Sequence, residues 1–112
     1  MHSACQLPLE ITVAEVQKRL GGVALIDVRE PDEHAIARME GAELIPMGAV
    51  PQHLAHLEGV SDEKDLIVLC HHGVRSLIVA QWLREHGIEN AQSMQGGIDA
   101  WSRLIDTSIP RY

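Results

Sequence analysis

The sequence predicts an α/β fold in which helices cover both faces of a central parallel sheet. Two observations favour this class. Short apolar segments of strand length alternate with segments of helical periodicity, and the central segment Leu66–Leu69 is apolar at every position. Strands that alternate with helices along a chain are typical of a parallel sheet. The chain has 112 residues, 46% hydrophobic and 22% charged, which suffices for one core but not for two domains.

We expect one domain over residues 1–112, with a core at about 5–104 and a C-terminal tail at 105–112. The expected elements, in chain order, are an extended lead-in at 6–11, a helix at 13–20, a strand at 23–28, a helix beginning near residue 31, a strand at 42–45, a helix at 48–57, a polar loop at 58–65, a strand at 66–69, a helix at 74–86, a strand at 91–94 and a helix at 98–104.

The first half of the chain carries clear boundary signals. Thr12 and Glu15 have the spacing of a capping box, which predicts that a helix begins at residue 13. Val23–Val28 has the apolar character of a buried strand. Pro31 suits the first position of the next helix, because proline lacks an N–H group that a helix start leaves unpaired. Pro46 stops the third strand.

Apolar periodicity and glycines delimit the second half of the chain. Val50, Leu54 and Leu57 fall on one side of the helix expected at 48–57. The helix at 74–86 is apolar on most sides, which fits deep packing against a sheet. Gly87 provides its C-terminal stop, and Gly96-Gly97 separates the last strand from the last helix.

Cys70 stands where the central strand ends, shortly before a helix begins. Parallel sheets place their functional sites at this carboxyl edge. A helix start has unpaired N–H groups and partial positive charge, so it favours an anion such as a thiolate. We expect the N–H groups of residues 71–76, together with Arg75, to make Cys70 a largely ionised nucleophile near neutral pH. The alternative is a buried, inert cysteine that closes the strand.

Asp27 and Arg29 end an earlier strand and therefore reach the same edge of the sheet. One interpretation of this pair is local, with turn hydrogen bonds and an ion pair to a neighbouring glutamate. The other is that both side chains support the loop that follows Cys70 from behind. The sequence leaves both interpretations open.

The segment Cys70-His71-His72-Gly73-Val74-Arg75-Ser76 resembles the active-site loop of the rhodanese-like sulfurtransferases. Three further blocks are similar to family motifs and follow in family order: Leu25-Ile-Asp-Val-Arg-Glu30, Gly41-Ala-Glu-Leu-Ile-Pro46 and Gly96-Gly-Ile-Asp-Ala-Trp101. The resemblance implies one small domain with five strands and about as many helices.

The resemblance also implies the chemistry and the partners. Cys70 would attack a sulfane sulfur, keep it as a persulfide and lose it to cyanide or to a thiol, including a protein thiol, in two displacements. The donor would be a small anion such as thiosulfate, and no cofactor is implied. The substrate would be bound by the loop residues His71, His72, Gly73, Val74, Arg75 and Ser76.

Two other functions compete with this interpretation. Cysteine phosphatases and arsenate reductases also combine a cysteine, a loop of N–H groups and an arginine, but their loop places five residues between the two side chains. Only four residues separate Cys70 from Arg75, which gives a cradle that fits a terminal sulfur better than a tetrahedral phosphate. The second competitor is a module that carries sulfur from one protein to another, or only binds partners.

The adjacent histidines His71 and His72 stand where thiosulfate-processing family members often carry arginine or lysine, which leaves the preferred donor open. We interpret them as solvent-exposed loop residues or, if protonated, as donors to an anionic substrate. Side chains of adjacent residues tend to diverge, so we expect no shared metal. His53 and His56 lack a further ligand in helical register and belong to a solvated face.

Charge and cysteine content limit the possible partners and location. The formal net charge of −7 disfavours nucleic acids and anionic membranes. Cys5 and Cys70 are too few for a disulfide framework, which fits a reducing compartment, and Cys5 is interpreted as a bystander thiol. No apolar run reaches the ~18 residues of a membrane span, and the chain start lacks a signal-peptide pattern. We therefore expect a cytoplasmic protein.

Overall fold

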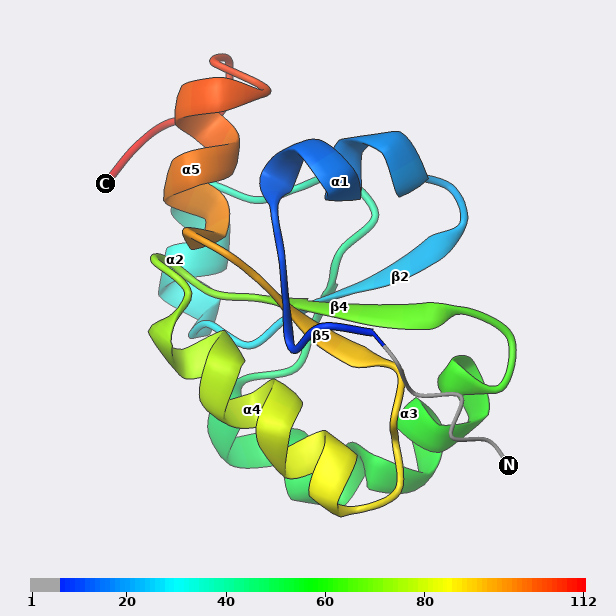
Figure 1. Cartoon of the computed structure of the whole chain (residues 1–112). Helices are drawn as coiled ribbons and strands as arrows, with labels where there is room; N and C mark the ends of the chain where they lie inside the picture. The colour runs from blue at the N-terminus through cyan, green and yellow to red at the C-terminus, as the bar shows by residue number, and fades with distance from the viewer. Residues whose placement is uncertain (1–6) are drawn as a thin grey trace.

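The computed structural model describes residues 7–112, which form a five-stranded parallel sheet with helices on both faces (Figure 1). The strands are β1 (Glu10–Ile11), β2 (Val23–Asp27), β3 (Glu43–Leu44), β4 (Asp65–Leu69) and β5 (Ala91–Met94). Their order across the sheet is β1-β5-β4-β2-β3, and each neighbouring pair runs parallel. The predicted α/β class and the five strands are confirmed.

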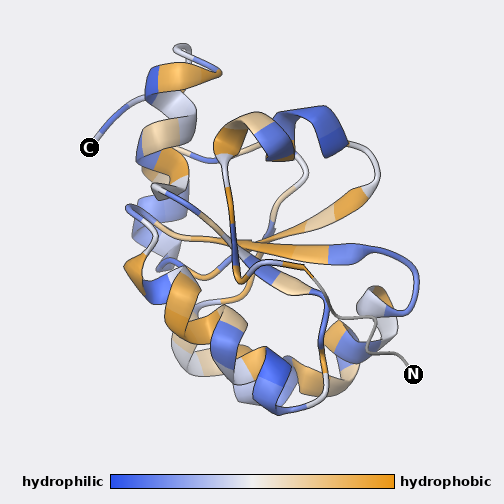
Figure 2. Cartoon of the chain, in the orientation of Figure 1, coloured by the Kyte–Doolittle hydropathy of each residue, from blue (hydrophilic) through white to orange (hydrophobic). Residues whose placement is uncertain are grey.

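The helices form two layers. They are α1 (Val13–Arg19), α2 (Pro31–Ile36), the 3-10 helix η1 (Met47–His53), α3 (Leu54–Ser61), α4 (Val74–Glu85) and α5 (Gly97–Leu104). Helices α1 and α5 pack on one face of the sheet, whereas η1, α3 and α4 pack on the other. In Figure 2, β2 and most of β4 carry hydrophobic colours, whereas the helices around them carry bands of hydrophobic and hydrophilic colour.

Strand β4 contributes to both layers of the core. Leu66 and Val68 pack toward α3 and α4, Ile67 and Leu69 pack toward α1 and α5, and all four are 0% exposed. The expectation that α4 is packed on most of its sides is wrong, because only one side is buried. Val79, Ala80 and Leu83 are buried, but Val74 and Ile78 are 68% and 54% exposed. One side of this apolar helix therefore faces solvent next to the loop that follows Cys70.

The segment before β4 differs most from the sequence-based expectation. The helix expected at 48–57 begins as η1, which contains Pro51, and changes to α3 at Leu54. Helix α3 continues to Ser61, so most of the polar loop expected at 58–65 is helical or belongs to β4. Gly59, which suggested a loop, lies within the helix with no atom within 4 Å of a Cβ built on it.

Residues 105–112, which were expected to form a tail, contain no helix or strand, and Ile105 and Ile109 pack against the core on the side of α5. The interpretation of Cys5 lies outside the described residues, as does the start of the expected lead-in. Across residues 7–112, no helix has both the length and the apolar character that crossing a bilayer requires.

Candidate active site

The ends of β2 and β4 bring the predicted site residues to one edge of the sheet. Asp27 lies in register with Leu69, and the Val28 N–H donates to the Leu69 carbonyl at 3.0 Å. Cys70 follows β4 directly, and Arg29 follows β2, so both lie at the carboxyl edge. This neighbourhood results from the β2–β4 pairing, which joins segments about forty residues apart in the sequence.

The sulfur of Cys70 is held by a short loop that leads into α4. The N–H groups of Gly73 and Ser76 donate to Sγ at 3.1 and 3.3 Å, and the thiol lies 3.4 Å from Ser76 Oγ. Ser76 Oγ in turn lies 2.7 Å from Ser93 Oγ on β5. Cys70 is only 1% exposed, but these groups give the sulfur a polar setting. Such a setting suits a thiolate, because N–H and O–H groups solvate its charge.

Helix α5 fixes the outer side of this loop. The Ile98 N–H donates to the Cys70 carbonyl oxygen at 2.9 Å, and the Asp99 N–H donates to the His71 carbonyl oxygen at 3.1 Å. Gly97 permits this approach, because a Cβ there would lie 2.4 Å from the His71 oxygen. The loop carbonyls therefore point to α5, which leaves loop N–H groups free to face the sulfur.

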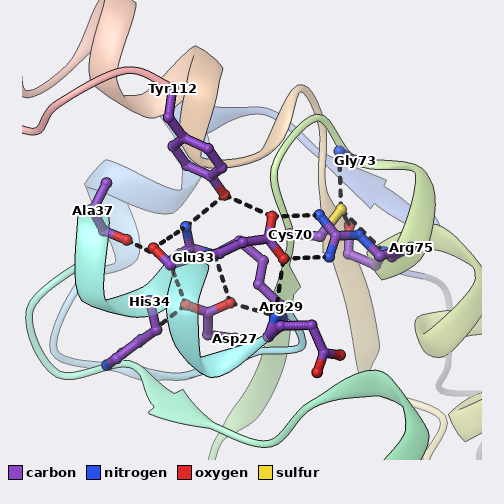
Figure 3. A network of polar contacts seen from close by, with 11 residues as sticks. Asp27, Arg29, Glu33, His34, Ala37, Cys70, Gly73, Arg75 and Tyr112 are labelled. Carbon is purple, nitrogen blue, oxygen red and sulfur yellow. Dashed lines mark hydrogen bonds and ion pairs between the residues drawn. The ribbon is translucent and has the colours of Figure 1, made fainter.

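Arg75 does not stand free beside the sulfur. Its Nη1 and Nη2 atoms donate to the two carboxylate oxygens of Glu33 at 2.7 and 2.9 Å (Figure 3). This hydrogen-bonded pairing lowers the pKa of Glu33 to about 2, against the opposing effect of burial. The same contact raises the pKa of Arg75, to which the charge of Cys70 also contributes. The cation expected near Cys70 is thus present but already paired.

Asp27 and Arg29 form a fully buried ion pair behind the loop. Arg29 donates from Nε and Nη2 to the two oxygens of Asp27 at 2.9 and 2.7 Å, and both side chains are 0% exposed. Burial lowers the pKa of Arg29, but its hydrogen bonds to Asp27 and Tyr112 raise it overall. The expected ion pair to a neighbouring glutamate is not formed, since Arg29 reaches Glu33 only at its carbonyl oxygen, 3.3 Å away.

Tyr112 links this buried pair to the Arg75–Glu33 pair. Its hydroxyl accepts from Arg29 Nη1 at 2.7 Å and donates to Glu33 Oε2 at 3.0 Å (Figure 3). Its ring stacks on His71 with the centroids 3.8 Å apart. The segment predicted as a tail therefore ends with its side chain against the loop that follows Cys70.

The side chains of His71 and His72 do not diverge as expected. Their rings stack with centroids 3.8 Å apart, and one ligand atom of each lies within 4.8 Å of a carboxylate oxygen of Asp99. A metal must lie in the plane of each imidazole that binds it, so stacked rings do not face one ion together. Asp99 also pairs with Arg111 and Arg103. Burial, followed by the charge of His72, lowers the pKa of His71.

Glu33, Ser93 and Tyr112 are among the residues at this site that were not predicted from the sequence. The position of Glu33 near the site could have been predicted, because it is an acidic residue in the first turn of a helix that starts at the same edge of the sheet. Ser93 lies on β5 and reaches the site only through sheet order. Tyr112 carries no local signal, since its contacts depend on how residues 105–112 fold back.

Comparison with known proteins agrees with this geometry. A family model described as the rhodanese-like domain matches residues 12–104. The chain belongs to this family. The Arabidopsis thaliana rhodanese-like/PpiC domain-containing protein 12, chloroplastic, is 36% identical across all of this chain, which spans only 35% of that protein. Because this relative is named as chloroplastic, the cytoplasmic location expected for the present chain stays a prediction.

Two relatives of similar length are named sulfurtransferases. The thiosulfate sulfurtransferase GlpE of Pseudoalteromonas translucida is 27% identical, with 80% of this rhodanese-like domain and 82% of GlpE covered. The structure of the human single-domain sulfurtransferase TSTD1 has a TM-score of 0.76 and 26% identity, over 88% of this chain and 98% of TSTD1. These relatives support sulfur transfer as the general activity of the domain.

Proposed function

We propose that this domain takes a sulfane sulfur from a donor, holds it as a persulfide on Cys70 and passes it to a thiol or to cyanide. The observation that carries the proposal is the position of Sγ, 3.1 and 3.3 Å from the N–H groups of Gly73 and Ser76. Aimed N–H groups stabilise an anionic sulfur, whether it is the thiolate before transfer or the persulfide afterwards.

In the first displacement, with thiosulfate as donor, the Cys70 thiolate attacks the outer sulfur of thiosulfate. A new S–S bond forms to Cys70, and the S–S bond of thiosulfate breaks. Sulfite leaves with the electron pair of that bond. In the second displacement, cyanide or a thiolate attacks the terminal sulfur, so thiocyanate or a new persulfide forms and the Cys70 thiolate returns.

The other loop residues have roles consistent with this cycle. Ser76 donates its N–H and places its hydroxyl beside the sulfur, while Gly73 supplies the second N–H. His71 and His72 would meet the donor at the entrance, Arg75 lies next to them but is held by Glu33, and Val74 contributes exposed apolar surface. Asp27 and Arg29 would support the loop from behind, through the contacts that Arg29 makes with Tyr112.

A second candidate is a sulfur-carrying module within a larger protein. It is favoured by one specific observation, namely that the chain spans about a third of the Arabidopsis relative. Both candidates use the same Cys70 persulfide and differ only in the acceptor, a small molecule or a protein thiol. Phosphate transfer is disfavoured by the four-residue spacing to Arg75 and by the engagement of that arginine with Glu33.

The test compares two substrates. We expect the protein to form thiocyanate from a sulfane donor plus cyanide, and Cys70→Ala to abolish this activity. An aryl phosphate serves as the second substrate. Release of phosphate without formation of thiocyanate would refute sulfur transfer and favour the phosphatase function instead.

A further inference from the structure

Glu33 occupies the edge of the Arg75 guanidinium that is formed by its two Nη atoms. Both carboxylate oxygens accept from the two Nη atoms of the guanidinium, at 2.7 and 2.9 Å. This fork-to-fork geometry is the one by which arginine also binds sulfonate- and phosphate-like groups. A donor such as thiosulfate, which carries three oxygens on one sulfur, would therefore compete with Glu33 for the same hydrogen-bond donors.

Glu33 is held in this position from two further directions. Its Oε1 accepts from the Glu30 N–H at 3.0 Å, as part of a capping box at the start of α2. Its Oε2 accepts from the Tyr112 hydroxyl at 3.0 Å, and that hydroxyl is itself fixed by Arg29. The side chain of Glu33 is 18% exposed. Four hydrogen bonds to one carboxylate make its displacement by a small anion unfavourable.

The local charge leads to the same conclusion. The Arg75–Glu33 pair and the buried Asp27–Arg29 pair each combine one positive and one negative charge (Figure 3). The whole chain carries a formal net charge of −7. An arriving dianion is therefore offered no unpaired arginine at this position and is repelled by the protein as a whole.

We propose that Glu33 is a specificity-determining residue that acts through Arg75, so that the site disfavours small oxyanionic donors and favours the persulfide of a thiol. This proposal rests on sulfur transfer at Cys70, as proposed above, and names the class of donor. A thiol persulfide has no sulfonate group and does not need the fork of Arg75. The Cys70 thiolate attacks its terminal sulfur, the S–S bond of the donor breaks and the donor thiolate leaves, so that Cys70 carries the sulfur with its proton.

The experiment compares two donors on four proteins. Thiosulfate and a low-molecular-weight alkyl persulfide are supplied to the wild type, Glu33→Gln, Glu30→Gln and the double variant Glu33→Gln with Arg75→Ala. Glu30→Gln is the matched control, because it removes a neighbouring carboxylate of the same capping box without touching Arg75. The measured quantities are kcat and KM for each donor, with circular dichroism to verify the fold.

We expect Glu33→Gln to raise kcat/KM for thiosulfate by about tenfold, mainly through a lower KM, because the fork of Arg75 becomes available. The values for the alkyl persulfide should stay within about twofold, as should all values for Glu30→Gln. The gain should disappear in the double variant, since it depends on Arg75. A purely structural role of Glu33 would instead lower the activity with both donors.

A folded Glu33→Gln variant with unchanged or lower kcat/KM for thiosulfate would overturn the proposal. If that variant does not fold, Tyr112→Phe provides the test, because it removes one hydrogen bond from Glu33 and should raise kcat/KM for thiosulfate by a smaller factor; no rise would overturn the proposal. Failure of the wild type to transfer sulfur from either donor is a different result, which would refute sulfur transfer itself.

Discussion

Replacement of Glu33 by glutamine removes the charge that faces Arg75 but keeps the size of the side chain. The hydrogen bonds from Arg75 lower the pKa of Glu33 from 4.5 to about 2. A carboxylate shifted by this amount stabilises the folded state by about 3 kcal/mol when it is ionised. Solvent reaches 18% of the Glu33 side chain and 33% of that of Arg75, and it screens the pair. We therefore expect Glu33→Gln to lose about 2 kcal/mol near neutral pH.

The pH dependence of this loss follows from the direction of the shift. The unfolded chain protonates Glu33 below about pH 4.5, whereas the folded chain resists protonation down to about pH 2. The stabilisation is thus complete above pH 4.5 and is lost as the pH falls toward 2. Urea titrations of the wild type and the variant should show a difference in unfolding free energy that shrinks with falling pH. A difference that is absent at neutral pH, or that does not change with pH, would refute the pairing.

Three further predictions concern the buried pair, the loop and His71. Asp27→Asn leaves the buried guanidinium of Arg29 without its counter-charge, so the unfolding free energy measured in denaturant titrations should fall by about 3–5 kcal/mol. A loss below about 1 kcal/mol would show that the Asp27–Arg29 pair does not stabilise the fold. Gly97→Ala places a methyl group 2.4 Å from the His71 carbonyl oxygen, so sulfur loading of Cys70 should slow by about tenfold or more. Gly59→Ala is the control, because no atom lies within 4 Å of the added methyl group, and it should leave the loading rate unchanged. Equal loading rates in both variants would show that α5 does not shape the loop. Burial and the charge of His72 lower the pKa of His71 below 6.5. The unfolding free energy of the wild type should therefore fall more steeply below pH 6.5 than that of His71→Gln. Parallel plots of unfolding free energy against pH for the two proteins would contradict the burial of the His71 ring.

The positions of the main elements follow from local signals in the sequence. The N-cap at Thr12, the proline at position 31 and the apolar run before Cys70 each mark a boundary that the structure keeps. The location of Cys70 at the carboxyl edge also needs only the order of strands and helices, because parallel strands end at a common edge. The segment before β4 was assigned wrongly, since Gly59 and the polar residues around it suggested a loop where α3 continues.

The polar contacts around Cys70 depend on tertiary structure and were less predictable. Arg75 was expected to face the sulfur as a free cation, but its partner Glu33 lies 42 residues away in the sequence. Tyr112 contacts Glu33 across 79 residues, after a segment without regular structure. No periodicity or motif in the sequence predicts a side-chain contact between residues so far apart along the chain. The stacking of His71 on His72 was also missed, because the position of Tyr112 helps to set the direction of the first ring.

The most direct test of the central proposal is the mass of the Cys70 peptide after treatment of the intact protein with a sulfane donor. We expect this peptide to gain the mass of one sulfur atom, to lose it again on addition of a thiol acceptor, and to remain unchanged in Cys70→Ser. A folded wild-type protein whose Cys70 gains no sulfur from thiosulfate or from an alkyl persulfide would contradict sulfur transfer at this residue.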